Sequence, residues 1–359
     1  MVNFILNTNL SIKTKKFNTN EIQLKISGFQ RAYGFSILGK KIFIPDFISG
    51  LIYELDIENK KTKILKRNNT QLNYLSTFER IKIKLSSKRS IIQPHDIYID
   101  DKSNFYITEM GPGRKKGKGK VLVFDKNFNL IKEIGLELHN NFGLLSPVMT
   151  KKIDNIFYVS EFGSNKILRF NNNFEFIDWI GEIDDIYTEI KKNSWLTSRN
   201  FININLLKPH AVEVGPDNNI YIADTGNHRI LKFSINGDFK GWVGKNKNGK
   251  INDNWSTADQ STKGDQLGAF NEPLDLVFKD DFIYVSEVGN NRIVKLGLDG
   301  KSYGWIGINE EKNKFIWTKD ISKKVNLNNP YGLKIKNNVV YIANRFYNEI
   351  IAIDSLNLF

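Results

Sequence analysis

The strongest constraint on the fold is a phrase of four short apolar segments that recurs along the chain. In residues 208–244 the segments AVEV, IYIA, ILKFS and FKGWVG are separated by turns rich in Gly, Asp and Asn. β-Branched and aromatic segments bounded by such turns are typical of a four-stranded antiparallel meander. Five further copies, two close and three divergent, lie at 271–307, 146–181, 29–66, 93–135 and 329–359.

An acidic residue closes the second strand of nearly every copy and marks the period of the repeat. These positions, which follow one another at intervals of 52 to 63 residues, are Asp46, Glu109, Glu161, Asp224 and Glu287, with Asn344 in the sixth copy. A sheet of four short strands cannot bury both of its faces alone, so the copies must stack radially around an axis. We therefore predict an all-β, six-bladed β-propeller that forms one domain over residues 1–359.

The sixth copy lacks a fourth strand. Residues 329–359 supply three strands, whereas EIQLKISG at 21–28 has the alternation and the terminal glycine of the other fourth strands. We expect 21–28 to pair with the last copy and to close the ring, because closure leaves no exposed sheet edge.

Composition excludes several kinds of site and leaves the partner open. Cysteine is absent, which excludes disulfides, thiolate zinc sites and cysteine nucleophiles. No apolar run approaches the ~20 residues of a membrane span, so we expect no membrane contact and take the cytoplasm as the default compartment. The net charge of +13 permits an anionic partner without identifying one. We expect a monomer.

The fourth copy resembles a known repeat family. The run DTGNHR at 224–229, within PHAVEVGPDNNIYIADTGNHRILKF at 209–233, looks like an NHL repeat. The resemblance implies a six-bladed propeller. It leaves function open, because NHL propellers serve as RNA-binding modules, as protein-interaction platforms and, in a minority, as metal-dependent lyases.

Strand direction places the candidate site at one end of the wheel. The start of each first strand and the end of each second strand lie at the same end, which also receives the long connections. These connections, each far beyond the ~4 to 6 residues that are usual, lie at about 67–90, 183–205, 245–268 and 309–326. Loops on a rigid scaffold often carry binding residues. We therefore expect a small molecule or a protein partner to bind in or above the channel on this face.

Two of the four histidines, His95 and His210, follow a proline at the start of a first strand. The residues at this position in the six copies are Tyr33, His95, Val148, His210, Leu274 and Tyr331. His95, His210 and Tyr331 occupy alternate copies, so their side chains converge on the axis. This arrangement suits a divalent metal with an open coordination position, zinc or magnesium more than calcium. Alternatively, the histidines are hydrogen-bonded channel residues.

Two lyase families share parts of this pattern. Peptidylamidoglycolate lyases are NHL-type propellers with three zinc-binding Pro-His histidines, and the chain is similar to them at His95 and His210 but has Tyr331 at the third position. The virginiamycin B lyase family is similar to residues 93–109, QPHDIYIDDKSNFYITE. That resemblance implies His95 as the base and Glu109 as a metal ligand in a magnesium-dependent elimination.

The lyase hypothesis assigns roles to further residues at this end of the channel. His95 or His210 would abstract a proton, and Arg31 would hold an anionic group of the substrate. Tyr331 would ligate the metal or act as the acid. The candidate ligand-binding residues, which surround the channel at this end, are Tyr33, Tyr331, Asp46 and Asn344.

A structural alternative applies to the acids that close the second strands. Such a carboxylate often caps the following turn or pairs with a nearby cation, as Asp224 could with Arg229 and Glu287 with Arg292. The same alternative holds for Glu161. It is weaker for Glu109, because glycines rebuild the loop that follows it.

A basic loop supports RNA binding as a further alternative. GRKKGKGK at 113–120 places five cations within eight residues on the loop-rich face. Neutralisation of phosphates by such a loop would make binding strongly dependent on salt. The other interpretation is a solvated loop, because no aromatic residue is interleaved with the cations. The sequence contains no Walker loop, GxSxG elbow or HExxH motif.

Overall fold

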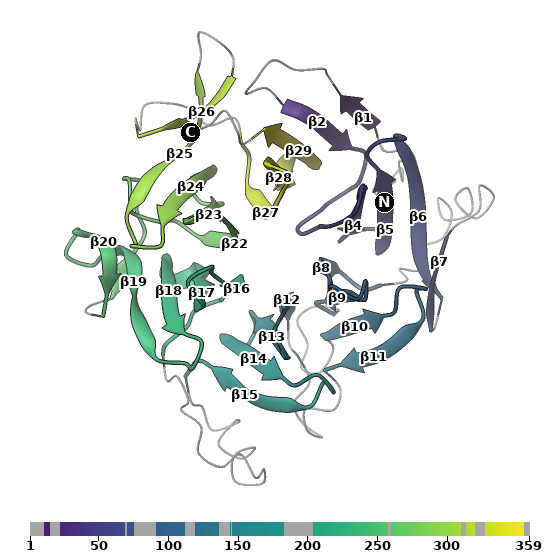
Figure 1. The fold of residues 1–359 in the computed structure, drawn as a ribbon, viewed down its shortest axis with the longest axis horizontal. Coiled ribbons are helices and arrows are strands. Elements are labelled where there is room, and N and C mark those ends of the chain that lie inside the picture. The colour runs from purple at the N-terminus through teal and green to yellow at the C-terminus, as the bar shows by residue number, and fades with distance from the viewer. Residues whose placement is uncertain are drawn as a thin grey trace, which may run out of the picture.

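The computed structural model describes residues 11–14, 22–68, 70–74, 91–111, 119–135, 144, 146–182, 204–257, 260–309, 314–319 and 327–354. These residues form six antiparallel sheets arranged as blades around a central axis (Figure 1). The prediction of an all-β, six-bladed propeller is confirmed. Among the described residues, no helix has the length and apolar character of a membrane span.

The blades are numbered here by the chain order of their inner strands. Blade one runs β3-β4-β5-β6-β7, formed by Ser36–Leu38, Lys41–Asp46, Leu51–Asp56, Lys61–Asn68 and Gln71–Tyr74. Blade two runs β8-β9-β10-β11, formed by Pro94–Ile99, Phe105–Glu109, Lys120–Phe124 and Leu130–Ile134. Blade three runs β12-β13-β14-β15, formed by Pro147–Ile153, Ile156–Glu161, Lys166–Phe170 and Phe176–Ile180.

The second half of the wheel repeats this order. Blade four runs β16-β17-β18-β19-β20, with β21 also paired to β19, formed by Val212–Val214, Asn219–Asp224, Arg229–Ser234, Phe239–Asn246, Ile251–Ser256 and Ser261–Thr262. Blade five runs β22-β23-β24-β25-β26, formed by Pro273–Lys279, Phe282–Glu287, Arg292–Gly297, Ser302–Asn309 and Lys314–Thr318. Blade six contains β27, β28 and β29, formed by Pro330–Lys336, Val339–Asn344 and Glu349–Asp354. Short 3-10 helices follow β17 and β28 at Thr225–Asn227 and Arg345–Tyr347.

The amino-terminal segment closes the ring as predicted. Strand β2, Ile22–Ser27, pairs antiparallel with β29, and Ile26 lies opposite Ile350. Its buried side chains Leu24 and Ile26 join Ile42 of blade one in a single apolar cluster. Burial of this apolar surface holds the first and last parts of the sequence together. A further strand that the sequence did not indicate, β1 at Ser11–Thr14, pairs with β2 on the outside.

Three blades carry an additional outer strand within segments that the sequence indicated only as long connections. Strands β7, β20 and β26 each form a hairpin with the preceding fourth strand. Pairing of this kind satisfies backbone groups that the outer edge of a blade would otherwise leave exposed. An outer strand needs no buried face, so it has no apolar alternation by which it could be found.

The inner strands approach each other closely enough to form hydrogen bonds between blades. The Gly34 N–H donates to the His95 carbonyl at 3.1 Å, and the Gly332 N–H donates to the Tyr33 carbonyl at 3.0 Å. A Cβ atom at Gly34 would lie 1.8 Å from Asp96 Oδ1. A larger residue here would force Asp96 to move, so the small size of Gly34 lets blades one and two meet closely beside the channel residues.

Candidate functional site at the channel mouth

Four ring-bearing side chains, from blades one, two, four and six, form a layer across one end of the channel. They are Tyr33, His95, His210 and Tyr331. His95 lies at the start of β8 and Tyr331 lies in β27, whereas Tyr33 and His210 lie in the segments just before β3 and β16. His95 and His210 are 3% and 2% exposed, and their ring centroids are 5.3 Å apart. The two histidines therefore meet at the axis although 115 residues separate them in the sequence.

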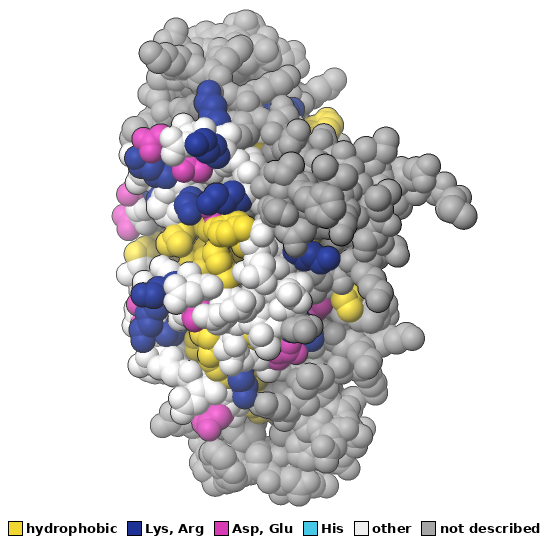
Figure 2. Space-filling view, turned by 90° about the vertical axis from the view of Figure 1, so that its right-hand side faces the viewer, with side chains coloured by type: hydrophobic (Ala, Val, Ile, Leu, Met, Phe, Trp, Pro, Cys, Tyr) yellow, Lys and Arg dark blue, Asp and Glu magenta, His cyan; other side chains and the backbone are white. Residues whose placement is uncertain are grey.

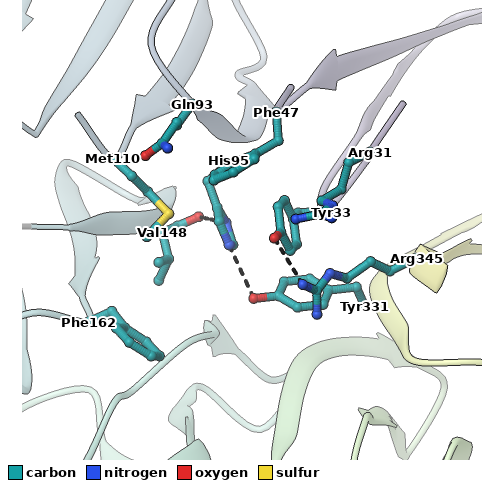
Figure 3. A pocket seen from close by; sticks show the side chains of 10 residues that line it. All are labelled: Arg31, Tyr33, Phe47, Gln93, His95, Met110, Val148, Phe162, Tyr331 and Arg345. Atoms are coloured by element: carbon teal, nitrogen blue, oxygen red, sulfur yellow. Dashed lines mark hydrogen bonds between the residues drawn. The ribbon is translucent and has the colours of Figure 1, made fainter. Parts of the chain in front are cut away.

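The Tyr331 hydroxyl lies between the two imidazoles, 3.1 Å from Nε2 of His95 and 3.1 Å from Nε2 of His210. The other ring nitrogen of His95, Nδ1, is 2.9 Å from the Val148 carbonyl (Figure 3). A carbonyl only accepts, so Nδ1 of His95 carries a hydrogen, and Nε2 of the neutral ring is an acceptor. Tyr331 donates to His95 in this arrangement, and its oxygen accepts from His210 in the tautomer that carries a hydrogen on Nε2. The Tyr331 hydroxyl thus links the two imidazoles.

His210 is held in its neutral form. The pKa of the His210 imidazole is lowered to about 3, mainly by burial; the Leu274 carbonyl opposes this shift, and the positive charge of Lys334 adds to it. The neutral imidazole can therefore donate or accept at Nε2, where it meets the Tyr331 hydroxyl. The fold therefore fixes both the position and the protonation state of this side chain.

Aromatic stacking fixes the outer side of the layer. The Tyr33 ring stacks on His95 with centroids 4.5 Å apart and an interplanar angle of 12°, and its centroid is 4.7 Å from that of Tyr331. The Arg345 guanidinium lies 4.7 Å above the centre of the Tyr33 ring and donates to the Tyr33 hydroxyl at 3.1 Å. Such a cation–π contact stabilises the arginine. We call the four ring-bearing side chains Tyr33, His95, His210 and Tyr331 the floor.

Above the floor lies a cavity of about 520 Å³. It is lined by side chains from blades one, two, three and six: Arg31, Tyr33, Phe47, Gln93, His95, Met110, Val148, Phe162, Tyr331 and Arg345. Figure 3 shows Arg31 and Arg345 on one side of the cavity and Met110, Val148 and Phe162 on the opposite side. The cavity thus has a cationic side and an apolar side.

Sequence reasoning missed four lining residues that share one position in the repeat. Each directly follows the residue that closes the second strand of its blade, and they are Phe47, Met110, Phe162 and Arg345. The acidic position was recognised, but the residue after it was not considered. Their fixed position, one residue after the end of the second strand, could have identified them. The second strands end at the same end of the channel where the histidines lie.

The two arginines of the cavity have no acidic partner among the described residues. No Asp or Glu is among the described side chains that line the cavity. Arg345 Nη1 donates to Asn329 Oδ1 at 3.0 Å, and its buried Nε has no acceptor. In blade four, by contrast, Arg229 pairs with Asp224 at 2.8 Å. In blade five, Arg292 pairs with the buried Glu287.

The predicted site residues that close the second strands lie behind the cavity. Asp46 accepts backbone N–H groups of Gln30 at 2.9 Å and Arg31 at 3.1 Å. Glu109 accepts the Ile92 N–H and lies 3.8 Å from Lys120. Burial raises the pKa of both carboxyl groups. These contacts are those of turn caps, and neither carboxylate lines the cavity.

Asn344 is the equivalent residue of blade six. Its side chain accepts the Asn328 N–H at 2.7 Å and donates to Glu349 at 2.9 Å, and it does not line the cavity. The structure therefore brings Arg31 together with the four floor residues. Asp46, Glu109 and Asn344 lie apart from them. Direct roles for these three in ligand binding or catalysis stay predictions.

The basic loop falls largely outside the described part of the chain, since residues 112–118 are not described. One side of the wheel is visible in the space-filling view (Figure 2). There, the Lys and Arg side chains of the described residues are interspersed with Asp and Glu and form no continuous stripe.

The fold and the channel site define the class of protein: a six-bladed β-propeller with a ligand-sized cavity at one end of its axis. The family model of the NHL repeat matches residues 206–233, within the fourth blade. The predicted resemblance to the NHL repeat is thus confirmed for this blade. None of the curated protein sequences matches the chain significantly.

Solved structures of similar fold cover almost the whole chain. Virginiamycin B lyase from Staphylococcus aureus is 12% identical with a TM-score of 0.50, and the match covers 96% of this chain and 98% of that one. An auxiliary nutrient binding protein from Bacteroides thetaiotaomicron is 13% identical with a TM-score of 0.55, covering 96% and 72%. A putative phosphatase from the same organism is 11% identical with a TM-score of 0.57, covering 92% and 72%. At these identities the likeness shows the fold alone.

Proposed function

We propose that this propeller binds a small molecule in the cavity above the floor. The observation that carries the proposal is the cavity itself. Its volume of about 520 Å³ falls within the roughly 300–1,000 Å³ that is usual for small-ligand sites. It combines an apolar wall with a few fixed polar groups, which is the composition of such sites. Solved structures of similar fold include a nutrient-binding protein and a lyase.

A thermal-shift screen with a matched pair of variants tests this function. The purified chain is heated with each member of a library of small metabolites, and a ligand present at about 100 times its Kd adds about 2.7 kcal/mol to the stability. Met110→Trp places an indole in the cavity, whereas Ile131→Trp adds the same side chain at an exposed strand position. We expect at least one compound to raise Tm by several degrees in the wild type and in Ile131→Trp but not in Met110→Trp.

The proposal is wrong if no compound stabilises the wild type. It is also wrong if the stabilisation survives in a folded Met110→Trp variant, since the ligand would then bind elsewhere. Circular dichroism of the variant shows whether it has kept its fold.

A second candidate function is a divalent-metal-dependent lyase, which one geometric observation favours. The Tyr331 oxygen lies 3.1 Å from both histidine Nε2 atoms, and the ligand atoms of a tetrahedral zinc with bonds of ~2.0–2.1 Å are separated by roughly 3.3 Å. His95, His210 and Tyr331 would hold the ion, which would supply Lewis-acid stabilisation of developing negative charge. The Val148 carbonyl already orients His95 as a metal ligand is usually oriented, with Nδ1–H donating and Nε2 accepting.

Metal analysis separates this candidate from simple binding. Protein purified without a histidine tag is analysed for bound elements and then titrated with Zn²⁺ by calorimetry. The lyase hypothesis expects one zinc per chain that is lost in the His95→Ala, His210→Ala double variant and retained in His228→Ala. Absence of zinc binding in the wild type would rule out the zinc form of this candidate, and a magnesium titration tests the other form in the same way.

A further inference from the structure

We infer that the ligand of the cavity is a small amphipathic anion, with an apolar body of about one ring and one oxyacid group, either a carboxylate or a phosphate, bound by Arg31 and Arg345. The inference rests on the proposed function, because it names the ligand class of that same cavity.

The first observation is the unbalanced charge of the cavity. Two arginines from neighbouring blades line it, and none of the other described lining residues carries a carboxylate. The Arg31 guanidinium has no ion pair with any described residue, and the polar contacts of Arg345 are to the neutral Asn329 and Tyr33. Both arginines are half-buried, and arginines that lose contact with water are normally paired. The missing negative charge is therefore the part that a ligand would supply.

The second observation is that Arg345 is held in place before any ligand arrives. Its guanidinium stacks on Tyr33 at 4.7 Å and is tethered at both terminal nitrogens by the Tyr33 hydroxyl and Asn329. The Nε–H remains buried without an acceptor. A planar guanidinium binds oxyanions through parallel N–H groups. Fixing it in advance lowers the entropy that binding costs.

The third observation is that the opposite side of the cavity is apolar. The repeat position that holds Arg345 in blade six holds Phe47, Met110 and Phe162 in blades one to three, and all four side chains line the cavity. A free inorganic anion would fill only the arginine side. A ligand that contacts both sides must carry charge at one end and apolar surface at the other.

Four probes separate charge from apolar surface in a calorimetric titration. These are 3-phenylpropionate, its uncharged analogue 3-phenylpropanol, propionate, which lacks the ring, and phenyl phosphate. We expect the acid to bind at least tenfold more tightly than the alcohol and than propionate. The advantage over the alcohol should shrink as NaCl is raised, because salt screens the charge. Tighter binding of phenyl phosphate than of phenylpropionate would identify phosphate as the headgroup, and the reverse would identify carboxylate.

Variants assign the two halves of the ligand to the two sides. Arg31→Gln and Arg345→Gln should each weaken binding of the acid at least tenfold and change binding of the alcohol less than threefold. Phe162→Ala should weaken both, and Lys301→Gln, at an exposed turn, should change neither. Because Arg345 contacts the floor, its replacement alters packing as well as charge. Arg31 makes no side-chain hydrogen bond or ion pair with the described residues, and its variant avoids that ambiguity.

Two failures can be told apart. Suppose a library compound stabilises the wild type and Met110→Trp abolishes the effect, but the acid shows no advantage over the alcohol or both arginine variants bind it normally. The anion inference is then wrong, and the proposed function stands. If no library compound and no probe binds, the proposed function fails, and the inference fails with it.

Discussion

His210 should make the stability of the protein fall in acid, and replacing it with glutamine should remove that part of the fall. The imidazole is 2% exposed, and burial lowers its pKa from the ordinary 6.5 to about 3. Between these two pH values the unfolded chain binds a proton at His210 that the folded chain does not. Stability therefore rises with pH across this window and is lost as pH falls.

The magnitude follows from the width of the window. Each pH unit below 6.5 costs about 1.4 kcal/mol while the folded imidazole stays neutral. At pH 4.5, two units below 6.5, the loss from His210 alone is about 2.7 kcal/mol. Glutamine does not titrate and carries an amide that can still hydrogen-bond to the Tyr331 hydroxyl. Between pH 7.0 and pH 4.5, the free energy of unfolding should therefore fall by about 2–3 kcal/mol less in His210→Gln than in the wild type.

Urea unfolding followed by tryptophan fluorescence measures the free energy of unfolding of the wild type and of His210→Gln, each at pH 7.0 and at pH 4.5. Other groups titrate in the same range, since burial raises the pKa of Asp96 to about 6 and that of Glu287 to about 7. Both groups are present in the wild type and in His210→Gln. Their contributions therefore cancel to first order when the pH-dependent losses of stability of the two proteins are subtracted. His228→Gln is the matched control; His228 is only half-buried, and its removal should alter the loss much less. Equal losses in the wild type and in His210→Gln would refute the claim that the folded channel keeps this imidazole neutral.

Two further predictions concern the closure of the ring and the meeting of blades. Ile26→Ala in β2 should destabilise the fold by about 2–5 kcal/mol, because the side chain is fully buried. The control Ile131→Ala, at an exposed position, should change the free energy of unfolding by less than about 0.5 kcal/mol. Equal effects of the two variants in urea unfolding would contradict a closing role for β2. Gly34→Ala should cost about 1–3 kcal/mol, because the new Cβ meets Asp96 Oδ1. The cost should shrink in an Asp96→Ala background, and strictly additive losses in this double-mutant cycle would exclude the clash.

The wheel was predictable because its information is local and repeated. Turn residues and β-branched segments recur with the same order in each copy, so one well-formed repeat at 208–244 makes the weaker ones recognisable. The pairing of 21–28 with the last blade followed from counting strands. The outer strands β7, β20 and β26 were not predictable in this way, since a strand at the solvent edge needs no buried side chains and leaves no periodic pattern.

The channel site was predictable only in part. Equivalent positions at the start of the first strands identified Tyr33, His95, His210 and Tyr331, because symmetry turns a sequence offset into a place near the axis. The same symmetry suggested Asp46, Glu109 and Asn344 as site residues, and in the structure their polar atoms contact backbone and side-chain groups behind the cavity. An offset gives the end of the channel at which a residue lies but not the direction of its side chain.

By itself, the sequence determined that the chain forms a closed six-membered wheel and which end of it carries the channel residues, because both depend on patterns within each repeat. Only the tertiary structure decided that one tyrosine hydroxyl lies between two histidines, and that two arginines line a cavity above an aromatic floor with no carboxylate among its described lining residues. The contacts around this cavity join residues up to 312 positions apart, as between Tyr33 and Arg345. The chemistry of these channel residues depends on which side chains lie next to them in the folded ring.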